Sequence, residues 1–401
     1  MTPPLSPVVR PRLASLLIIA ATATALSAVD LVLPAVPALP DLMQTSTARA
    51  QWIMAAFVAG ATLGLPLFGA LSARLGRRRL FIAALAAFAV ISLAGGLVND
   101  IDGLIAVRFA QGLASSGPAV LAPGLIRSLF SDAGAIRALS LMGSVEALIP
   151  GFAPLLGAWL FQHFSWPAAF WLTGAVALAL TGVALGWRGL LPRVGTGQSA
   201  SGKGGYGPLL RNPRFLRYAS GHTLVLAALL TFVFSAPAVM VRAMGGTIGD
   251  FILMQMIGVT TFILAANGAG WLVARTGAEA MIRAGTLVAA LGGTALLGYA
   301  LAGRGDAGDL KYLFWLLNAG LGLRVGPGFV AALRATGGDD DRGSALILLS
   351  VTGIAALMTA AIAPFVERGL LPLTAVVAGL AWLAVVLLYS LPGHADREGE
   401  P

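Results

Sequence analysis

The chain has 401 residues, of which 58% are hydrophobic and only 11% are charged, whereas soluble domains average about 45–50% apolar and about 25% charged residues. So much apolar surface cannot be hidden from water by folding alone, so the composition excludes a soluble enzyme, a nucleic-acid-binding protein and a disordered chain. The net charge of +9 comes from scattered basic residues that form no patch with aromatic side chains, and the absence of cysteine excludes disulfides and thiolate metal sites.

Twelve apolar runs follow in chain order, each close to the roughly 20 residues that a helix needs to cross the hydrocarbon of a bilayer. They are predicted over 13–36, 51–72, 79–98, 103–126, 137–161, 166–188, 215–240, 248–272, 280–302, 311–334, 343–366 and 369–391. A β-barrel is excluded because its strands alternate apolar and polar residues, whereas these runs are apolar on all faces. The first run stays apolar through Val36, which favours a retained helix over a cleaved signal peptide.

Basic residues are distributed unevenly between the loops. With the N-terminus inside the cell, nineteen of the 26 Lys and Arg residues fall in cytoplasmic segments and five on the opposite side, and Arg108 and Arg324 lie within spans. Loops rich in Lys and Arg stay in the cytoplasm. Both termini are therefore predicted to be cytoplasmic.

The chain is predicted to consist of two halves. The longest polar stretch, 191–214, is rich in Gly, Ser and charge and is interpreted as a cytoplasmic linker between one six-helix bundle over 1–190 and a second over 215–401 with a short tail. The halves repeat in order, since Gly69–Gly76 aligns without gaps to Gly270–Gly277, Gly117-Pro118 recurs as Gly326-Pro327, and Ala153-Pro154 recurs as Ala363-Pro364. Internal repeats with a midplane site between them are typical of secondary transporters. The predicted fold class is an all-α membrane protein of twelve helices in two pseudo-symmetric bundles.

Asp30 is an ionisable residue inside the first span. A carboxylate within a membrane helix costs about 2.5–3.5 kcal/mol on insertion scales, so Asp30 is expected to face a cavity rather than lipid. Low-dielectric surroundings favour the uncharged form of a carboxyl group, which makes Asp30 a candidate for binding a proton or a cationic ligand. The alternative is a hydrated aspartate near the outer membrane surface.

Glu146 in span five and Arg108 in span four are further candidates for proton coupling. Arg108 lies three residues before Gln111 and shares its helix face, and a buried arginine needs a counter-charge or several carbonyl groups. An arginine–carboxylate pair near a cavity is a plausible proton switch, with Asp30 or Glu146 as the acid. Alternatively, Glu146 is a structural partner or reaches water, and Arg108 extends its charge to the outer surface.

Arg324 lies in span ten, which corresponds to span four in the second half. It either binds an anionic or polar substrate or holds helices together through carbonyl groups. Polar side chains such as His222 and Asn318 more often make packing hydrogen bonds between helices than bind ligands, but both are candidates. The predicted substrate cavity comprises Asp30, Gln111, Glu146, His222, Asn318 and Arg324.

These motifs resemble the major facilitator superfamily over residues 13–391. Its loop signature between spans two and three is matched by Gly69, Leu71, Arg74, Gly76, Arg77 and Arg78, its span-four signature by Arg108, Gln111 and Gly112, and the span-five signature of drug exporters by Ala153-Pro154-Leu155-Leu156-Gly157. Asp30 before Pro34 and Pro37 is similar to the drug:proton antiporters of the bicyclomycin- and chloramphenicol-resistance type.

The resemblance implies proton-coupled efflux of a small amphipathic solute by alternating access in the bacterial cytoplasmic membrane, with the proton gradient as energy source and no cofactor or metal. It also implies a conformational gate formed by Gly69, Arg74, Gly76, Arg77, Arg78, Gly112, Pro154 and Gly157. Two acids of the family pattern are replaced by Ala73 and Ser128. Arg74 and Arg127 are therefore expected to meet other acids or lipid phosphates.

Other functions are weighed against this one. The same fold also transports sugars and other metabolites, in either direction, and fold alone does not decide the substrate. An enzyme is not expected, because no nucleophile–base or metal motif is visible. A sensor or receptor with the same fold is a further alternative, although such proteins often carry an appended soluble domain. The expected partners are a small-molecule substrate, protons and the lipid bilayer, with no nucleic acid, and the chain is expected to work as a monomer.

Overall fold

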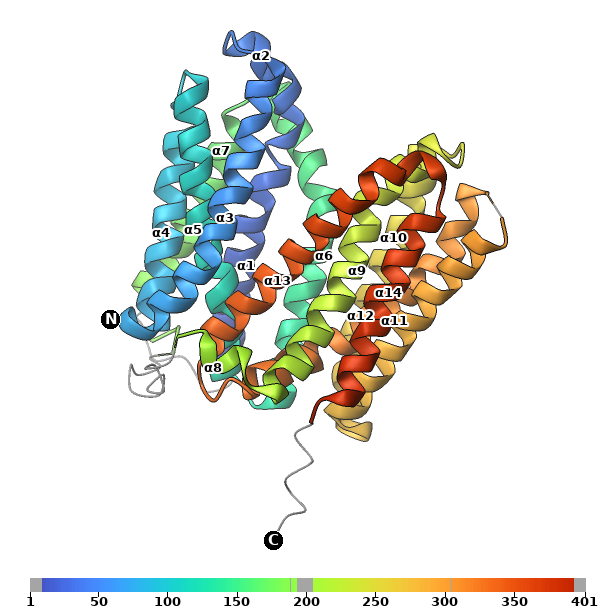
Figure 1. Cartoon of the computed structure of the whole chain (residues 1–401). Helices are drawn as coiled ribbons and strands as arrows, with labels where there is room; N and C mark the ends of the chain where they lie inside the picture. Colours follow the sequence, from blue (N-terminus) through green and yellow to red (C-terminus); the bar gives the residue numbers. More distant parts are fainter. Residues whose placement is uncertain (1–8, 188, 193–204, 304, 393–401) are drawn as a thin grey trace. The chain divides into compact units, whose positions relative to one another are not determined.

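A computed structural model describes residues 9–187, 189–192, 205–303 and 305–392 of the chain (Figure 1). Every regular element in these ranges is helical. Twelve of the described helices are long and apolar enough to cross a membrane, which confirms the predicted fold class and number of spans. Much of the predicted linker 191–214 lies outside the described residues.

The first six spans run from α1 to α7. They are formed by α1 (Val9–Asp30) with the 3-10 helix η1 (Leu33–Ala38) and α2 (Leu39–Leu42), by α3 (Thr47–Leu75), α4 (Arg77–Gly95), α5 (Ile101–Leu129), α6 (Asp132–His163) and α7 (Ala168–Gly186).

The last six spans run from α9 to α14. The short helix α8 (Gly207–Leu210) precedes α9 (Pro213–Arg242), α10 (Ile248–Thr276), α11 (Ala278–Leu301), η2 (Ala307–Leu310) with α12 (Lys311–Arg334), α13 (Asp340–Ile362) with η3 (Ala363–Arg368), and α14 (Leu371–Ser390).

Several helices begin earlier than hydropathy predicts because polar residues cap them. Asp100 accepts a hydrogen bond from the Gly103 amide at the start of α5, at 2.7 Å, and Asn212 accepts from two amides at the start of α9. At the start of α10, which begins at the predicted residue 248, Thr247 and Asp250 form a reciprocal capping box. Side-chain oxygens at these positions satisfy amides that the first turn leaves unpaired. Hydropathy detects only the apolar middle of such a helix.

The chain divides into two compact units. Unit 1 contains Met1–Ser131, Val145–Lys203 and Gly338–Leu346, and unit 2 contains Asp132–Ser144, Gly204–Gly337 and Ile347–Pro401. The first turns of α6 therefore group with unit 2, and the first turns of α13 group with unit 1. The predicted bundles, 1–190 and 215–401, assign each helix wholly to one half. They therefore do not include this exchange of the starts of α6 and α13.

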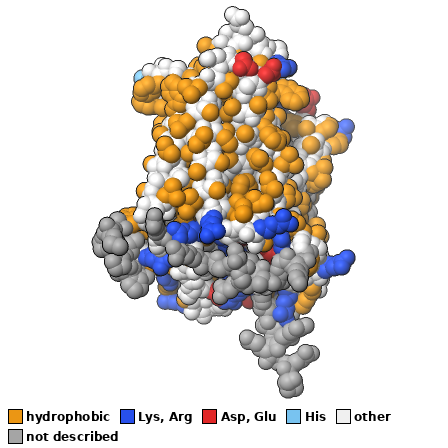
Figure 2. Space-filling model, turned by 90° about the vertical axis from the view of Figure 1, so that its left-hand side faces the viewer, with side chains coloured by type: hydrophobic (Ala, Val, Ile, Leu, Met, Phe, Trp, Pro, Cys, Tyr) orange, Lys and Arg blue, Asp and Glu red, His pale blue; other side chains and the backbone are white. Residues whose placement is uncertain are grey.

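The surface fits a membrane environment. Figure 2 shows one face on which apolar side chains cover the middle and Lys and Arg side chains gather along one margin. The exposed apolar residues include Trp52, Leu63, Phe152 and Leu264, each more than half exposed. Patches of this kind are rare on soluble monomers and expected on a surface that faces lipid.

Candidate functional site

The first span is interrupted at the residue that the sequence singles out. Helix α1 ends at Asp30, and a 3-10 helix continues from Leu33. Pro34 explains the break, because it has no N–H to donate to the Asp30 carbonyl four residues earlier. The predicted first span over 13–36 lies within the span Val9–Leu42, and its last part is a 3-10 helix rather than an α-helix. The Asp30 side chain is half-buried, and no other described residue forms a hydrogen bond or ion pair with its carboxylate.

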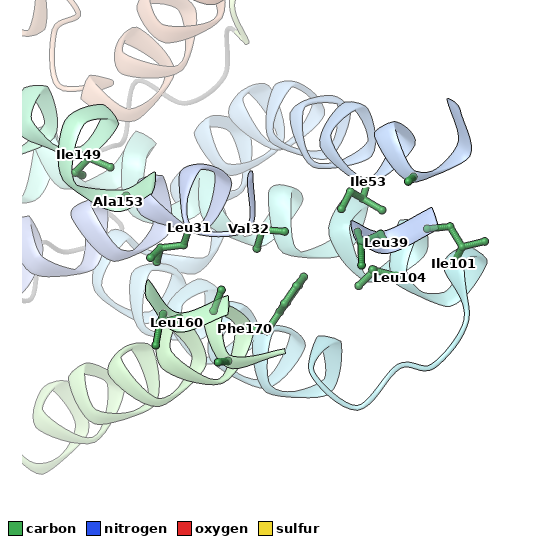
Figure 3. Packing of buried hydrophobic residues seen from close by; sticks show 13 residues of the cluster. Leu31, Val32, Leu39, Ile53, Ile101, Leu104, Ile149, Ala153, Leu160 and Phe170 are labelled. Carbon is green, nitrogen blue, oxygen red and sulfur yellow. The ribbon is translucent and has the colours of Figure 1, made fainter. Parts of the chain in front are cut away.

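Apolar side chains from α6 pack around this break. Leu31 and Val32 are buried in a cluster that also contains Ile149, Ala153 and Leu160 (Figure 3). The segment after Asp30 is thus held by buried apolar contacts as well as by backbone hydrogen bonds, such as those from the Leu31 amide to the Ser27 carbonyl and from the Ala35 amide to the Val32 carbonyl.

Gly157 brings the backbones of α6 and α1 into direct contact beside Asp30. A Cβ atom at Gly157 would lie only 2.2 Å from the Leu31 carbonyl oxygen and 3.0 Å from the Leu31 Cα. Both atoms belong to the backbone and cannot rotate away. The glycine of the span-five signature is therefore required by the path of the chain next to Asp30.

A Gly157→Ala substitution is expected to displace the α1 break. Overpacking of this kind typically costs about 1–3 kcal/mol, so we expect a lower unfolding temperature in detergent and slower transport. Gly151→Ala is the matched control in the same helix, because a Cβ there meets nothing within 4 Å. Equal behaviour of the two variants would contradict the role given to Gly157.

Arg108 lies fully buried on α5 and binds the end of α1. Its Nη1 donates to the Ala28 carbonyl at 3.0 Å and to Gln111 Oε1 at 2.8 Å, and its Nε donates to the Ile53 carbonyl of α3 at 3.3 Å. The last carbonyls of a helix lack partners within it, and a cation there also interacts favourably with the helix dipole. Arg108 therefore caps α1 two residues before Asp30.

The surroundings of Arg108 are uncharged. Its guanidinium stacks over the Phe57 ring at 4.4 Å and lies 5.8 Å from the Phe170 ring. Gln111 passes the network on to α4 by donating to Ser92 at 2.8 Å. Among the described residues, the hydrogen-bond acceptors of Arg108 are two carbonyls, an amide oxygen and the Met54 sulfur, and none is a carboxylate. Because Arg108 is 0% exposed, it does not reach the membrane surface in this structure.

An Arg108→Lys substitution is expected to destabilise the protein although it keeps the charge. An ammonium group cannot reach carbonyls on two helices and Gln111 at once, and each buried acceptor left unpaired costs about 1–3 kcal/mol. Thermal unfolding in detergent measures the loss. Arg49→Lys is the control, because Arg49 pairs with Asp102 at the exposed surface, where exchange should change stability by less than about 1 kcal/mol. Equal unfolding temperatures for the two variants would contradict this account.

Glu146 lies on α6 and forms a hydrogen bond with Thr22 of α1. The Thr22 hydroxyl also lies 3.0 Å from the Ile19 carbonyl. Thr22 precedes Asp30 by eight residues, which corresponds to roughly 12 Å along a helix. Asp30 and Glu146 are therefore not one hydrogen-bonded pair of acids, because Glu146 of α6 meets α1 at Thr22, about two turns before Asp30.

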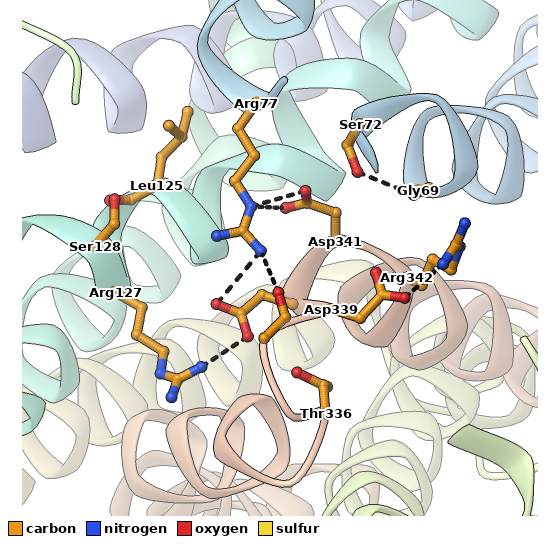
Figure 4. A network of polar contacts seen from close by, with 12 residues as sticks. Gly69, Ser72, Arg77, Leu125, Arg127, Ser128, Thr336, Asp339, Asp341 and Arg342 are labelled. Carbon is orange, nitrogen blue, oxygen red and sulfur yellow. Dashed lines mark hydrogen bonds and ion pairs between the residues drawn. The ribbon is translucent and has the colours of Figure 1, made fainter. Parts of the chain in front are cut away.

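A charge network joins α4, α5 and the first turn of α13 within unit 1 (Figure 4). Arg77, the first residue of α4, donates from Nε to both carboxylate oxygens of Asp341 at 2.8 Å and from Nη2 to the Gly338 carbonyl at 3.1 Å. Arg127 donates to Asp340 at 2.7 Å. Arg77, Asp340 and Asp341 are each less than 10% exposed. We name this set the α13 charge cluster.

The two aspartates of the α13 charge cluster were missed as functional candidates from the sequence. The signal was present, since Asp339, Asp340 and Asp341 stand together directly before an apolar run. They supply the negative charge that Ala73 and Ser128 lack. Arg127 thus meets an acid, whereas Arg74 is exposed and joins no ion pair in the part of the chain that the structure describes.

In unit 2, Arg324 and His222 lie together and fully or almost fully buried. Arg324 Nη1 donates to the Gly221 carbonyl of α9, while its Nε and Nη2 and the Nδ1 of His222 have no partner among the described residues. His222 also packs edge-on against Phe329, with ring centroids 5.1 Å apart. Asn318 lies elsewhere on α12 and donates to the Phe314 carbonyl at 3.1 Å.

The structure thus brings together only some of the predicted cavity residues. Arg108 bonds to Gln111 and to the Ala28 carbonyl, two residues before Asp30, and Glu146 on α6 meets α1 further from the break, at Thr22. Arg324 and His222 form a separate group in unit 2. Their grouping into one substrate cavity remains a prediction.

A model of the family described as Major Facilitator Superfamily matches residues 16–353. The chain belongs to the Major Facilitator Superfamily. As a member of this superfamily, it is a multi-pass membrane transporter, and its twelve spans fit that assignment.

The chain is also similar to individual proteins. It is 24% identical over 313 residues, covering 77% of this chain and 76% of the other, to a bicyclomycin resistance protein homolog of Haemophilus influenzae. It is 28% identical over 225 residues to the multidrug transporter MdfA of Edwardsiella piscicida, a match that spans 55% of each protein. The solved proton:xylose symporter XylE has the same fold, with a TM-score of 0.70 and 14% identity over 96% of each chain.

The loop signature of the superfamily forms the junction of α3 and α4. Gly76 adopts a φ of +80° between the two helices, and its counterpart in the repeat, Gly277, adopts +84° between α10 and α11. Only glycine takes this conformation readily. The sharp turn places Arg77 at the start of α4, within reach of the α13 charge cluster.

The remaining signature residues lie near these sites. The Gly69 carbonyl accepts a hydrogen bond from Ser72 at 3.0 Å. Gly112 lies against the Phe57 carbonyl where α5 crosses α3, and Pro154 lies on α6 one turn before Gly157. Arg78 is half-buried at the start of α4. Their predicted role in a conformational gate is not decided by these positions.

Proposed function

We propose that the chain is a proton-driven exporter of small amphipathic, drug-like solutes across the bacterial cytoplasmic membrane, with both termini in the cytoplasm. The observation that carries this proposal is Asp30, a half-buried carboxylate without a charged partner at a break in a membrane helix. Broken helices in secondary transporters mark ion and substrate sites, because backbone groups at the break can take part in binding. The names of the bicyclomycin-resistance and MdfA relatives support a drug-like solute.

In this scheme Asp30 binds either a proton from outside or the outgoing solute, and mutual exclusion couples the two fluxes. Arg108 acts as a positioning residue, because it holds the end of α1 that carries Asp30. Glu146 provides a second protonatable position about two turns away. Gln111, His222, Asn318 and Arg324 are proposed as polar groups that contact the solute.

The α13 charge cluster is proposed as part of the gate. Its contacts lie in the part of α13 that belongs to unit 1, up to Leu346, whereas the helix from Ile347 onward belongs to unit 2. If the two units move relative to each other during transport, either α13 must bend or Arg77 must release Asp341. The proton gradient supplies the energy in this scheme, and one chain suffices as the transporter.

Transport into proteoliposomes tests the proposal. Vesicles with an acidic interior should accumulate a drug from outside as protons leave, and collapse of the gradient with a protonophore should stop accumulation. Bicyclomycin, a lipophilic cation and xylose form a suitable panel. Uptake of xylose driven by an acidic exterior would instead support the alternative, proton-coupled transport of a sugar or metabolite, for which the unpaired guanidinium nitrogens of Arg324 are also suitable.

A further inference from the structure

Arg108 and Arg324, the two arginines with 0% exposure among the described residues, differ in how many of their N–H groups have hydrogen-bond partners. Arg108 has three oxygen acceptors and two aromatic rings around it. Arg324 is equally inaccessible to solvent, but it has one carbonyl partner, and its Nε and Nη2 are unpaired among the described residues. An arginine stays protonated in proteins, and a buried charge without compensation is strongly destabilising. Arg324 therefore lacks an anionic partner among the residues that the structure describes.

The unpaired nitrogens of Arg324 form one edge of the guanidinium group. Nε and Nη2 point in parallel, and this pair of N–H groups matches the two oxygens of a carboxylate. A round ion such as chloride cannot use both donors equally well. The geometry of the unpaired edge thus favours a carboxylate over a halide.

Gly328 leaves room for one added carbon atom beside this edge. A Cβ atom built there would lie 3.4 Å from Arg324 Nη2, 3.7 Å from Nε and 4.0 Å from His222 Nδ1, all ordinary contact distances. The missing side chain of Gly328 therefore leaves a position in front of both arginine nitrogens and of the unpaired histidine nitrogen. In its Nδ1-protonated tautomer, His222 adds a third donor to the same position.

We propose that Arg324, His222 and the backbone at Gly328 form a carboxylate-binding site in unit 2. This inference rests on the proposed export function in one respect, namely that the carboxylate belongs to the transported solute. The substrate class is then narrowed to amphipathic molecules that carry an acidic group. The binding site itself does not depend on the direction of transport or on its coupling to protons.

Ligand-induced stabilisation of the purified full-length protein in detergent tests the site. Sodium formate and sodium acetate are the probes, at constant ionic strength against sodium chloride. The wild type should show a saturable rise in unfolding temperature with formate and acetate, and a smaller one with chloride. Gly328→Ala places a methyl group in front of the arginine edge without a close contact, so it should weaken formate binding on the order of tenfold, the equivalent of about one charged hydrogen bond.

Two further variants make the result decisive. Gly353→Ala, in the interior of α13 with nothing within 4 Å of a Cβ, should bind formate like the wild type. Arg324→Gln removes the cation, keeps a donor for the Gly221 carbonyl, and should abolish the response even if Gly328→Ala does not fold. Equal responses of wild type, Gly328→Ala and Arg324→Gln, or equal stabilisation by chloride and formate, would overturn the carboxylate site.

A third measurement separates this site from the export function. Benzoate should stabilise the wild type, whereas benzamide, with the same ring and no charge, should not, and Arg324→Gln should remove the difference. Benzoate binding in a protein that transports no solute would leave the site in place and contradict export. Gradient-driven drug export that is unchanged in Arg324→Gln would overturn the assignment of this site to the transported solute.

Discussion

The Asp30→Asn protein is expected to lose gradient-driven transport down to the flux of protein-free vesicles. Asparagine has the size and polarity of aspartate but cannot exchange a proton at neutral pH, so the coupling step is removed while the shape of the site is kept. Exchange of labelled for unlabelled solute needs no net proton movement and should persist. The measurement compares uptake into vesicles with an acidic interior and solute exchange without a gradient.

The same variant should fold normally. No described residue forms an ion pair with Asp30, so replacing it removes a partly buried charge without leaving a partner unpaired, and the unfolding temperature should stay the same or rise. Asp41→Asn is the control, since Asp41 lies exposed on α2 later in the same span. Full gradient-driven transport by Asp30→Asn, or an equal loss in Asp41→Asn, would remove Asp30 from the coupling mechanism.

Hydropathy predicts the number and order of the spans because each run of about 20 apolar residues must be covered by lipid or protein. It does not predict where helices end, since helix ends depend on polar caps such as Asp100 and Asn212. It also does not distinguish a kinked helix from a broken one. Pro34 is visible in the sequence, but the break at Asp30 is also held by Gly157 and Arg108, which lie on other helices.

The polar partners were the least predictable part of the site. An arginine inside a span requires hydrogen-bond acceptors. Because the chain contains both carboxylates and backbone carbonyls, the sequence does not show which of them a given arginine contacts. The carbonyl partners of Arg108 lie 55 and 80 residues away along the chain. Their proximity follows only from the crossing of α1, α3 and α5. In the same way, the sequence was compatible with either a binding or a packing role for Arg324. Its carbonyl partner, Gly221, is identified only by the packing of α9 against α12.

The α13 charge cluster should respond to mutation as a coupled pair. Asp341→Asn leaves the buried guanidinium of Arg77 with weaker partners, and Arg77→Gln removes the cation that pairs with both buried aspartates. Breaking a buried ion pair from one side costs about 3–5 kcal/mol. The double variant should cost less than the sum of the two, with a coupling energy of about 1–3 kcal/mol. Arg74→Gln, at an exposed position, should leave stability unchanged.

Thiol labelling tests whether the ion pair between Arg77 and Asp341 belongs to the proposed gate. The chain contains no cysteine, so a maleimide reagent reports on a single introduced thiol without background. Ala345 lies on α13 one turn after Asp341 and is 1% exposed, so Ala345→Cys should react slowly in an otherwise unchanged protein. Adding Asp341→Asn should accelerate the reaction if Arg77 holds the first turn of α13 on unit 1, and adding Arg74→Gln should not. An additive double variant together with unchanged labelling would show that the pair is only incidental to the fold. Another restraint would then have to hold the start of α13, because its residues up to Leu346 belong to unit 1 and the rest of the helix to unit 2.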